Sequence, residues 1–345
     1  MNMQSREDDM KNALGGLFMV GLPGTELDDS TRNLINTYGI NNFILFKRNA
    51  ENPEQIRILC LGLAEACRAA GLGAPLISID QEGCTVARLK TPYFTEFPDA
   101  RALAESERAE ELLTDYARTC AKELLAVGIN MNLAPVLDVS PAGLGLFMER
   151  RSLGGTPEQV ARLGALVITA MQENGLAACA KHFPGLGGAT LDPHKVLPVV
   201  DRSLDELRGC DLVPFGAAIR AGVAGVMTSH TVYPQLDSEV PATLSPRILG
   251  GVLRDELGYD GMVVTDDLEM GAIENEGTVA DAALVAFKAG ADMLLICHEH
   301  AKIIAAYGLL SRAVGGEVSE ERVRKSLGRI GGVRRRFAGD KLEEV

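Results

Sequence analysis

Short runs of consecutive apolar residues recur along the whole chain, and longer segments with helix-like spacing of apolar positions separate them. An unbroken apolar run of this length is typical of a strand buried on both faces, as in a parallel sheet. The runs that we expect to form strands are Phe18–Leu22, Asn42–Phe46, Leu76–Asp80, Asn130–Val139, Ala178–Phe183, Gly225–His230, Gly261–Asp267 and Asp292–Cys297.

The segments between these runs carry helix signals. Within residues 107–127, four residues spaced by four predict one buried helix face: Leu112, Tyr116, Cys120 and Leu124.

Helix boundaries can be predicted in three places. Thr156 precedes Pro157, which suits a first helical turn, and Gln159 could close a capping box. Gly175 suits the end of that helix. We expect further helices to begin after Ser203 and to run over 319–337.

Eight strands that alternate with helices predict a (β/α)8 TIM barrel, and an open doubly wound sheet is the alternative. The 345 residues can bury a sizeable core, and no linker, repeat or low-complexity tract divides them. We therefore expect a single domain over residues 1–345, with its core at about 15–335.

The formal net charge of −13 argues against a nucleic acid or an anionic membrane surface as partner, because both require a basic protein surface. No stretch of about 18 apolar residues predicts a membrane-spanning helix. The first ten residues lack the apolar core of a signal peptide, and the seven cysteines are odd in number and scattered. We expect a cytoplasmic protein with reduced thiols, as a monomer or a weak oligomer.

Polar residues follow the apolar runs directly. In a barrel of this type the carboxyl ends of the strands form the active face, so charged residues at six successive ends indicate an active site more than a solvated rim. These segments are Asp80-Gln81-Glu82, Glu149-Arg150-Arg151, Lys181-His182, Thr228-Ser229-His230, Thr265-Asp266-Asp267 and Cys297-His298-Glu299-His300.

The last of these segments could suggest a metal site. Its two histidines are two residues apart, however, so a helix would not present them on one face. We expect neither a metal nor another cofactor.

Several motifs together resemble the family-3 glycoside hydrolases, in particular the single-domain bacterial β-N-acetylhexosaminidase type. The resemblance covers about residues 15–335, and the motifs occur in the family's order. They are Ile-Asp-Gln-Glu-Gly, Asn-Leu-Ala-Pro-Val-Leu-Asp-Val, Lys-His-Phe-Pro-Gly, Val-Met-Thr-Ser-His and Val-Val-Thr-Asp-Asp-Leu-Glu-Met.

The resemblance implies catalytic roles for three residues. Asp266 would be the nucleophile that forms a glycosyl-enzyme intermediate. His194 would be the acid/base, since imidazole titrates near neutral pH, and Asp192 would orient it. Without the resemblance, Asp192 and His194 would suggest only a turn and a surface histidine, and Asp266 could be a helix cap.

The resemblance also implies that five residues bind the sugar in the first subsite: Asp80, Arg88, Arg151, Lys181 and His182. A carboxylate can accept hydrogen bonds from two hydroxyl groups, and Lys and Arg donate to others. A buried polar pair that serves packing alone is the other interpretation of Lys181 and His182. His230 and Met270 are expected to line the pocket, and Ser245 to cap a helix.

The sequence departs from the family pattern in two loops. Cys84 and Thr85 replace Gly-Arg after the third strand, and Leu186, Gly188 and Ala189 replace His, Asp and Thr in the loop after the fifth. Pro193 replaces Ser between Asp192 and His194, and it stiffens that link because its ring restricts φ.

The function that the resemblance implies is retaining exo-β-N-acetylglucosaminidase activity on a small carbohydrate or muropeptide released in peptidoglycan turnover. Three alternatives stay open. The same scaffold could be a glycoside phosphorylase, because a His acid/base does not repel incoming phosphate as a carboxylate would. It could also be a β-glucosidase, or a sugar-binding barrel without catalysis.

Overall fold

The computed structural model describes residues 13–189 and 197–339, and its centre is one sheet of eight parallel strands. Hydrogen-bonded neighbours follow the order β7-β6-β5-β4-β3-β2-β1-β8. A parallel bridge between Val264 and Met293 joins β7 to β8, so the sheet closes almost completely into a barrel. The barrel prediction is confirmed, and the open doubly wound sheet is wrong. The strands are β1 (Phe18–Gly21), β2 (Asn42–Leu45), β3 (Leu76–Ile79), β4 (Met131–Asn132), β5 (Ala177–Phe183), β6 (Gly225–Thr228), β7 (Met262–Val264) and β8 (Leu294–Ile296).

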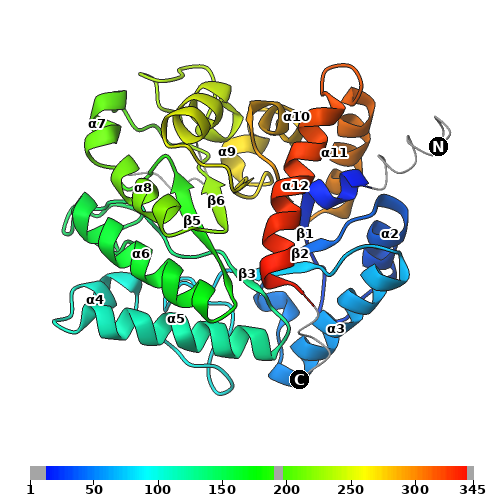
Figure 1. The fold of residues 1–345 in the computed structure, drawn as a ribbon, viewed down its shortest axis with the longest axis horizontal. Helices are drawn as coiled ribbons and strands as arrows, with labels where there is room; N and C mark the ends of the chain where they lie inside the picture. The colour runs from blue at the N-terminus through cyan, green and yellow to red at the C-terminus, as the bar shows by residue number, and fades with distance from the viewer. Residues whose placement is uncertain (1–12, 190–196, 340–345) are drawn as a thin grey trace.

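Helices surround the strands (Figure 1). The longer ones are α2 (Asp29–Tyr38), α3 (Pro53–Ala69), α5 (Ala109–Ala126), α6 (Pro157–Glu173), α8 (Leu212–Arg220), α10 (Val279–Ala289), α11 (His300–Ala313) and α12 (Glu320–Phe337). Shorter ones are α4 (Ala100–Ala104), α7 (Leu204–Gly209) and α9 (Gly271–Glu274), with a π-helix, η4, at Arg247–Glu256. Single 3-10 turns are η1 (Gly15–Leu17), η2 (Lys47–Asn49) and η3 (Ala242–Leu244).

The end of the described chain packs beside its beginning. Figure 1 shows α12, in red, next to the blue N-terminal elements. Arg334 Nη2 donates to the side-chain oxygens of Asn41 and Asn42 at 2.9 and 2.7 Å. These bonds attach the last described helix to the start of β2.

The predicted helix boundaries are confirmed. Thr156 caps α6 by accepting a hydrogen bond from the Gln159 backbone, and Gly175, with φ of 85°, follows its end. The Gln159 side chain donates to the Ala104 carbonyl instead of closing a capping box. Ser203 caps α7, and Ser319 caps α12. Ser245 likewise accepts a hydrogen bond from the Ile248 backbone at 3.2 Å.

Two details differ from the sequence prediction. β4 is only two residues long, although the apolar run spans 130–139, because the chain leaves regular pairing near Pro135, which has no N–H to donate. The run stays buried all the same. In α5 the buried face includes Leu113, whereas Leu112 is only half-buried.

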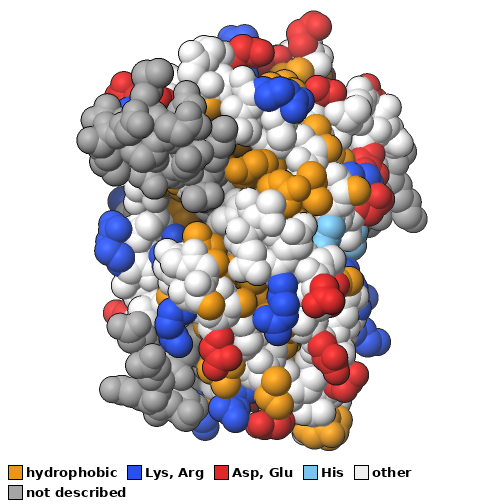
Figure 2. Space-filling view, turned by 90° about the vertical axis from the view of Figure 1, so that its right-hand side faces the viewer, with side chains coloured by type: hydrophobic (Ala, Val, Ile, Leu, Met, Phe, Trp, Pro, Cys, Tyr) orange, Lys and Arg blue, Asp and Glu red, His pale blue; other side chains and the backbone are white. Residues whose placement is uncertain are grey.

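The surface and the thiols agree with the composition. On the face in Figure 2, acidic and basic side chains are interspersed instead of forming a patch of one sign. Among the described residues, no helix combines the length and apolar character needed to cross a bilayer. All seven cysteines are free thiols, and only Cys84 is exposed.

Candidate active site

The carboxyl ends of the parallel strands bring most of the predicted site residues to one face of the barrel. Asp80 directly follows β3, Lys181 and His182 are in the last part of β5, and Asp266 follows β7 by two residues. The charges of Asp80 and Asp266 both act on the buried thiol of Cys179, whose pKa burial raises to about 12. Residues that are far apart in the sequence therefore converge at one rim, as this fold requires.

The first-subsite residues form a connected ion-pair network. Lys181 Nζ is 2.8 Å from Asp80 Oδ1 and 2.6 Å from Glu82 Oε1. Arg88 Nη2 binds the other Asp80 oxygen at 3.0 Å, and Arg151 makes two hydrogen bonds of 2.8 Å to Glu82. Glu82 was absent from the predicted site, although it is part of the Asp-Gln-Glu-Gly motif. It holds both Lys181 and Arg151 in place.

This network keeps its members charged despite their burial. Burial by itself raises the pKa of Asp80, but Lys181 and Arg88 outweigh it and hold the pKa well below its ordinary value. In the same way, Arg151 and Lys181 overcome burial and lower the pKa of Glu82 to about 2. Burial lowers the pKa of Lys181, yet the two carboxylates raise it above its usual value. The site thus contains three cations and two carboxylates.

Arg88, Asp80 and Arg151 are the members of this network that reach the surface. Their side chains are 31%, 13% and 12% exposed, against 3% for Lys181 and 5% for Glu82. Among the residues that the structure describes, Arg88 Nε is buried and has no hydrogen-bond partner, so the exposed part of this guanidinium is its terminal nitrogens. Asp80 and Arg88 are therefore placed to accept from and donate to a hydroxyl-rich molecule.

His182 is oriented by a carboxylate that the sequence analysis did not assign to the site. Asp138 is fully buried, and its Oδ2 lies 2.8 Å from His182 Nδ1. A carboxylate can only accept, so Nδ1 carries the proton and Nε2 is the nitrogen on the other side of the ring. Asp138 Oδ1 also accepts the backbone N–H of Leu186 at 2.8 Å. Asp138 thus connects the end of β5 to the loop that follows it, and its signal was the Asn-Leu-Ala-Pro-Val-Leu-Asp-Val motif.

The two adjacent aspartates after β7 have different surroundings. Asp267 Oδ1 accepts the backbone N–H groups of Glu269 and Cys297 at 3.1 and 3.2 Å. Burial raises the pKa of Asp267 to about 7, and Glu269 and Asp266 add to the shift. The Asp266 side chain makes one hydrogen bond within the described part of the chain, from the Asp267 backbone at 2.9 Å. Asp267 connects β7 to β8, whereas the Asp266 carboxylate has no second hydrogen-bond donor among the described residues.

His230 supports the backbone beside Asp266. It is buried, and its Nε2 lies 2.9 Å from the Asp267 carbonyl oxygen. Its Nδ1 lies 2.8 Å from the Thr243 hydroxyl. Both ring nitrogens thus have scaffold partners, while Met270, also buried, precedes α9.

Asp192 and His194 lie outside the described residues, so their predicted roles stay predictions. The described start of the same loop shows how the family departures are accommodated. Leu186 is buried in the core, where it replaces a histidine. A Cβ at Gly188 would lie 3.3 Å from Arg202 Nη2, and Arg202 pairs instead with the buried Asp211.

The other departures lie in the loop after β3. Thr85 donates its backbone N–H and its hydroxyl to Asp99 Oδ1 at 2.8 and 2.6 Å. Cys84 is exposed. With Cys84 and Thr85 in this loop, Asp80 is hydrogen-bonded to both Arg88 and Lys181.

The segment with two histidines after β8 does not gather them around one point. His298 Nδ1 lies 3.2 Å from Arg48 Nη1, and its Nε2 lies 3.5 Å from Asp267 Oδ2. His300 Nδ1 lies 3.0 Å from the Ser30 hydroxyl. The two imidazoles have separate partners.

Comparison with known proteins agrees with this geometry. The model of the glycosyl hydrolase family 3 N terminal domain matches residues 10–333. A protein named beta-hexosaminidase from Pseudomonas aeruginosa (strain LESB58) is 38% identical over 297 residues, which are 86% of this chain and 87% of that protein.

Solved structures show the same relationship. A family 3 beta-N-acetylglucosaminidase from Paenibacillus superposes with a TM-score of 0.89 at 40% identity, covering 95% of this chain and 62% of that one. The present chain thus spans less than two thirds of that protein. A beta-N-acetylhexosaminidase from Beutenbergia cavernae superposes with a TM-score of 0.85 at 30% identity. The match covers 94% of this chain and 98% of that one. Through its barrel, the chain belongs to glycosyl hydrolase family 3.

Proposed function

We propose that the chain is a retaining exo-β-N-acetylglucosaminidase that removes terminal N-acetylglucosamine from fragments released in peptidoglycan turnover. The family supports glycoside hydrolysis, and the names of the Pseudomonas, Paenibacillus and Beutenbergia proteins support the N-acetylhexosamine. The observation that carries the proposal is the position of Asp266, available at the end of β7 on the face that holds the Asp80–Lys181–Glu82 network.

The mechanism uses the rim residues in two steps. Asp80 and Arg88 bind sugar hydroxyls, and the fixed network behind them keeps both charged. The Asp266 carboxylate attacks the anomeric carbon while His194 donates a proton to the departing glycosidic oxygen, which leaves a covalent glycosyl-enzyme. Water then attacks the same carbon, His194 takes its proton, and Asp266 leaves as a carboxylate. Two inversions at one carbon retain the β configuration.

Within this mechanism, Asp192 orients His194 and favours its protonated form, as a carboxylate does beside an imidazole. Arg151 and Lys181 keep Glu82 ionised and hold the network together. His182, oriented by Asp138, presents Nε2 to the substrate. No cofactor takes part.

The test is hydrolysis of p-nitrophenyl β-N-acetylglucosaminide by the wild type, Asp266→Asn and Asp260→Asn. Asp260 is the matched control, because it is also an aspartate beside β7 but precedes the strand, at the opposite end of the barrel. We expect Asp266→Asn to lose at least about a thousandfold in kcat and Asp260→Asn to keep it. Equal activity of the wild type and Asp266→Asn would remove Asp266 as the nucleophile.

Product analysis separates the alternatives. Proton NMR of the first product should show the β anomer, and an initial α anomer would contradict retention. Added inorganic phosphate should leave the product unchanged, whereas a sugar 1-phosphate would establish a phosphorylase. Faster turnover of the matching β-glucoside would favour a β-glucosidase. Binding of N-acetylglucosamine without any turnover would leave a sugar-binding barrel.

A further inference from the structure

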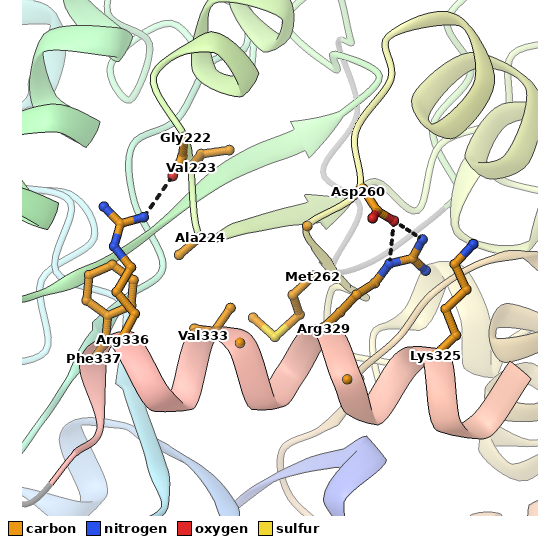
Figure 3. A pocket seen from close by; sticks show the side chains of 13 residues that line it. Gly222, Val223, Ala224, Asp260, Met262, Lys325, Arg329, Val333, Arg336 and Phe337 are labelled. Carbon is orange, nitrogen blue, oxygen red and sulfur yellow. Dashed lines mark hydrogen bonds and ion pairs between the residues drawn. The ribbon is translucent and has the colours of Figure 1, made fainter. Parts of the chain in front are cut away.

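A groove lies at the other end of the barrel from Asp266. It has a volume of about 480 Å³ and lies between α12 and the loops that lead into β6 and β7 (Figure 3). These loops are at the amino ends of the strands, so the groove cannot share a ligand with the candidate active site. Its volume is within the range of about 300–1,000 Å³ that is usual for small-molecule sites.

Three cations on α12 face this groove: Lys325, Arg329 and Arg336. Arg329 is neutralised by Asp260, whose Oδ1 lies 3.1 Å from its Nε, and by the buried Asp292, which lies 3.2 Å from its Nη1. The Lys325 ammonium makes no hydrogen bond or close ion pair with any residue in the described ranges, although Arg329 and the Lys325 charge together lower the pKa of Asp260. The groove therefore carries an excess of positive charge on a chain whose net charge is −13.

Lys325 and Arg336, which have no close ion pair among the described residues, lie at opposite ends of the groove. Figure 3 shows Lys325 at one end and Arg336 at the other, with the Arg329–Asp260 pair between them. Arg336 has a distant hydrogen bond of 3.4 Å to the Gly222 carbonyl oxygen and lies 4.7 Å from the Phe337 ring centre. The two cations are eleven positions apart in the sequence, which is about 16 Å along a helix axis, before the side chains reach inward.

The floor between the two ends is apolar. Ala224, Met262 and Val333 line it (Figure 3). Gly328 and Gly332 keep the helix surface low along the same stretch. A ligand that fits must therefore combine a non-polar middle with charge at its ends.

Packing within the described protein does not explain these two glycines. A Cβ at Gly328 would have no atom within 4 Å, and one at Gly332 would meet only Arg335 Nη2 at 4.0 Å. Glycine inside a helix is less favourable than alanine. Helix α12 therefore has the less stabilising residue at two positions where alanine would fit, and the groove is open there.

We propose that this groove binds an elongated organic anion with an apolar middle and a negative group at each end. The two ends would pair with Lys325 and Arg336, and the middle would lie over Met262 and Val333. The proposal does not depend on the enzymatic activity, because the site is at the opposite end of the barrel.

Isothermal titration calorimetry of the full chain at low ionic strength tests the proposal with p,p′-biphenyldisulfonate as the probe. The mono-anion p-biphenylsulfonate has the same apolar body and one charge. We expect the dianion to bind, and to bind several-fold more tightly than the mono-anion. No binding at millimolar concentration, or equal affinities, would overturn the proposal.

Two variants locate the binding. Replacing both end cations, Lys325→Gln with Arg336→Gln, should weaken dianion binding about tenfold or more. The matched control is Arg118→Gln with Arg247→Gln, which removes the same charge from exposed positions of α5 and η4 outside the groove. Equal weakening by both pairs would mean a general charge effect and would overturn the proposal.

A third variant keeps the charges and fills the space. Gly332→Leu should abolish dianion binding while the melting temperature stays the same or rises, because leucine is a better helix former. Dianion binding that survives in a folded Gly332→Leu protein would place the probe elsewhere and contradict the proposal. Hydrolysis of the p-nitrophenyl glycoside, measured separately, should be unchanged in all these variants.

Discussion

The buried carboxyl of Asp267 makes a quantitative prediction about stability. Its side chain is 14% exposed, and burial raises its pKa from an ordinary 3.8 to about 7. The groups that face it are Asp266 and Glu269 on its own segment, Cys297 and His298 after β8, and the Arg48 guanidinium. Asp267→Asn keeps an oxygen that can accept the two backbone hydrogen bonds and removes the titration.

The sign follows from the raised pKa. Between about pH 4 and pH 7 the folded protein keeps a proton on Asp267 that the unfolded chain has lost, so the free energy of unfolding falls as pH rises. The shift corresponds to about 4 kcal/mol over the whole window, and about 3 kcal/mol of it lies between pH 5 and pH 8. Asparagine does not titrate, so its contribution to the free energy of unfolding does not change with pH. Relative to the wild type, Asp267→Asn should therefore become more stable by about 3 kcal/mol between pH 5 and pH 8.

Urea unfolding at pH 5 and pH 8 measures this difference, because other titrating groups are shared by both proteins and cancel. The control is Asp260→Asn, since Asp260 is 84% exposed and Arg329 lowers its pKa. We expect the difference between Asp267→Asn and the wild type to grow by about 3 kcal/mol toward pH 8. If the stabilities of wild type and Asp267→Asn change in parallel with pH, Asp267 is ionised in the folded protein and the reasoning is refuted.

Three further predictions concern the site and its supports. Lys181→Met leaves two buried carboxylates without the cation that bridges them, and urea unfolding should show a loss of about 3–5 kcal/mol; a loss below about 1 kcal/mol would contradict a bridging role. Gly187→Ala would place a Cβ on the Val139 carbonyl oxygen, so kcat on the p-nitrophenyl glycoside should fall about tenfold or more, while Gly188→Ala, which meets only a side chain, should stay near wild type. Ser203→Ala removes a capping box and should lower the free energy of unfolding by about 1 kcal/mol; no change in the urea midpoint would argue against the cap.

The sequence by itself determined the barrel architecture, the helix caps and the strand ends at which charged residues lie. Apolar runs of strand length that alternate with amphipathic segments leave few arrangements that bury every strand on both faces, and the barrel is one of them. Helix caps such as Thr156 and Ser203 were predictable because capping is local. The positions of Asp80, Lys181 and Asp266 at one face were predictable because each directly follows or ends an apolar run, and parallel strands bring such ends together, whereas their roles came from the family resemblance.

Only the tertiary structure decided which residues these groups contact. Glu82 belongs to the site because it pairs with Arg151, about 70 residues away in the sequence. Asp138 belongs to it because it pairs with His182, which is 44 residues away. No local sequence pattern predicts such pairs. The different surroundings of Asp266 and Asp267 likewise depend on Cys297, which reaches Asp267 from β8. A pKa or an ion-pair partner depends on burial and on charges from distant segments, so it is a property of the folded barrel.

The groove beside α12 shows the same division. The sequence displays Lys325, Arg336 and two glycines in a helical segment, a pattern that is compatible with an ordinary solvated face. Only the packing of α12 against the amino ends of β6 and β7 turns that face into a cavity with an apolar floor. The periodicity of a helix indicates which residues share a face. What lies opposite that face depends on contacts between segments about 100 residues apart in the sequence, and only folding brings such segments together.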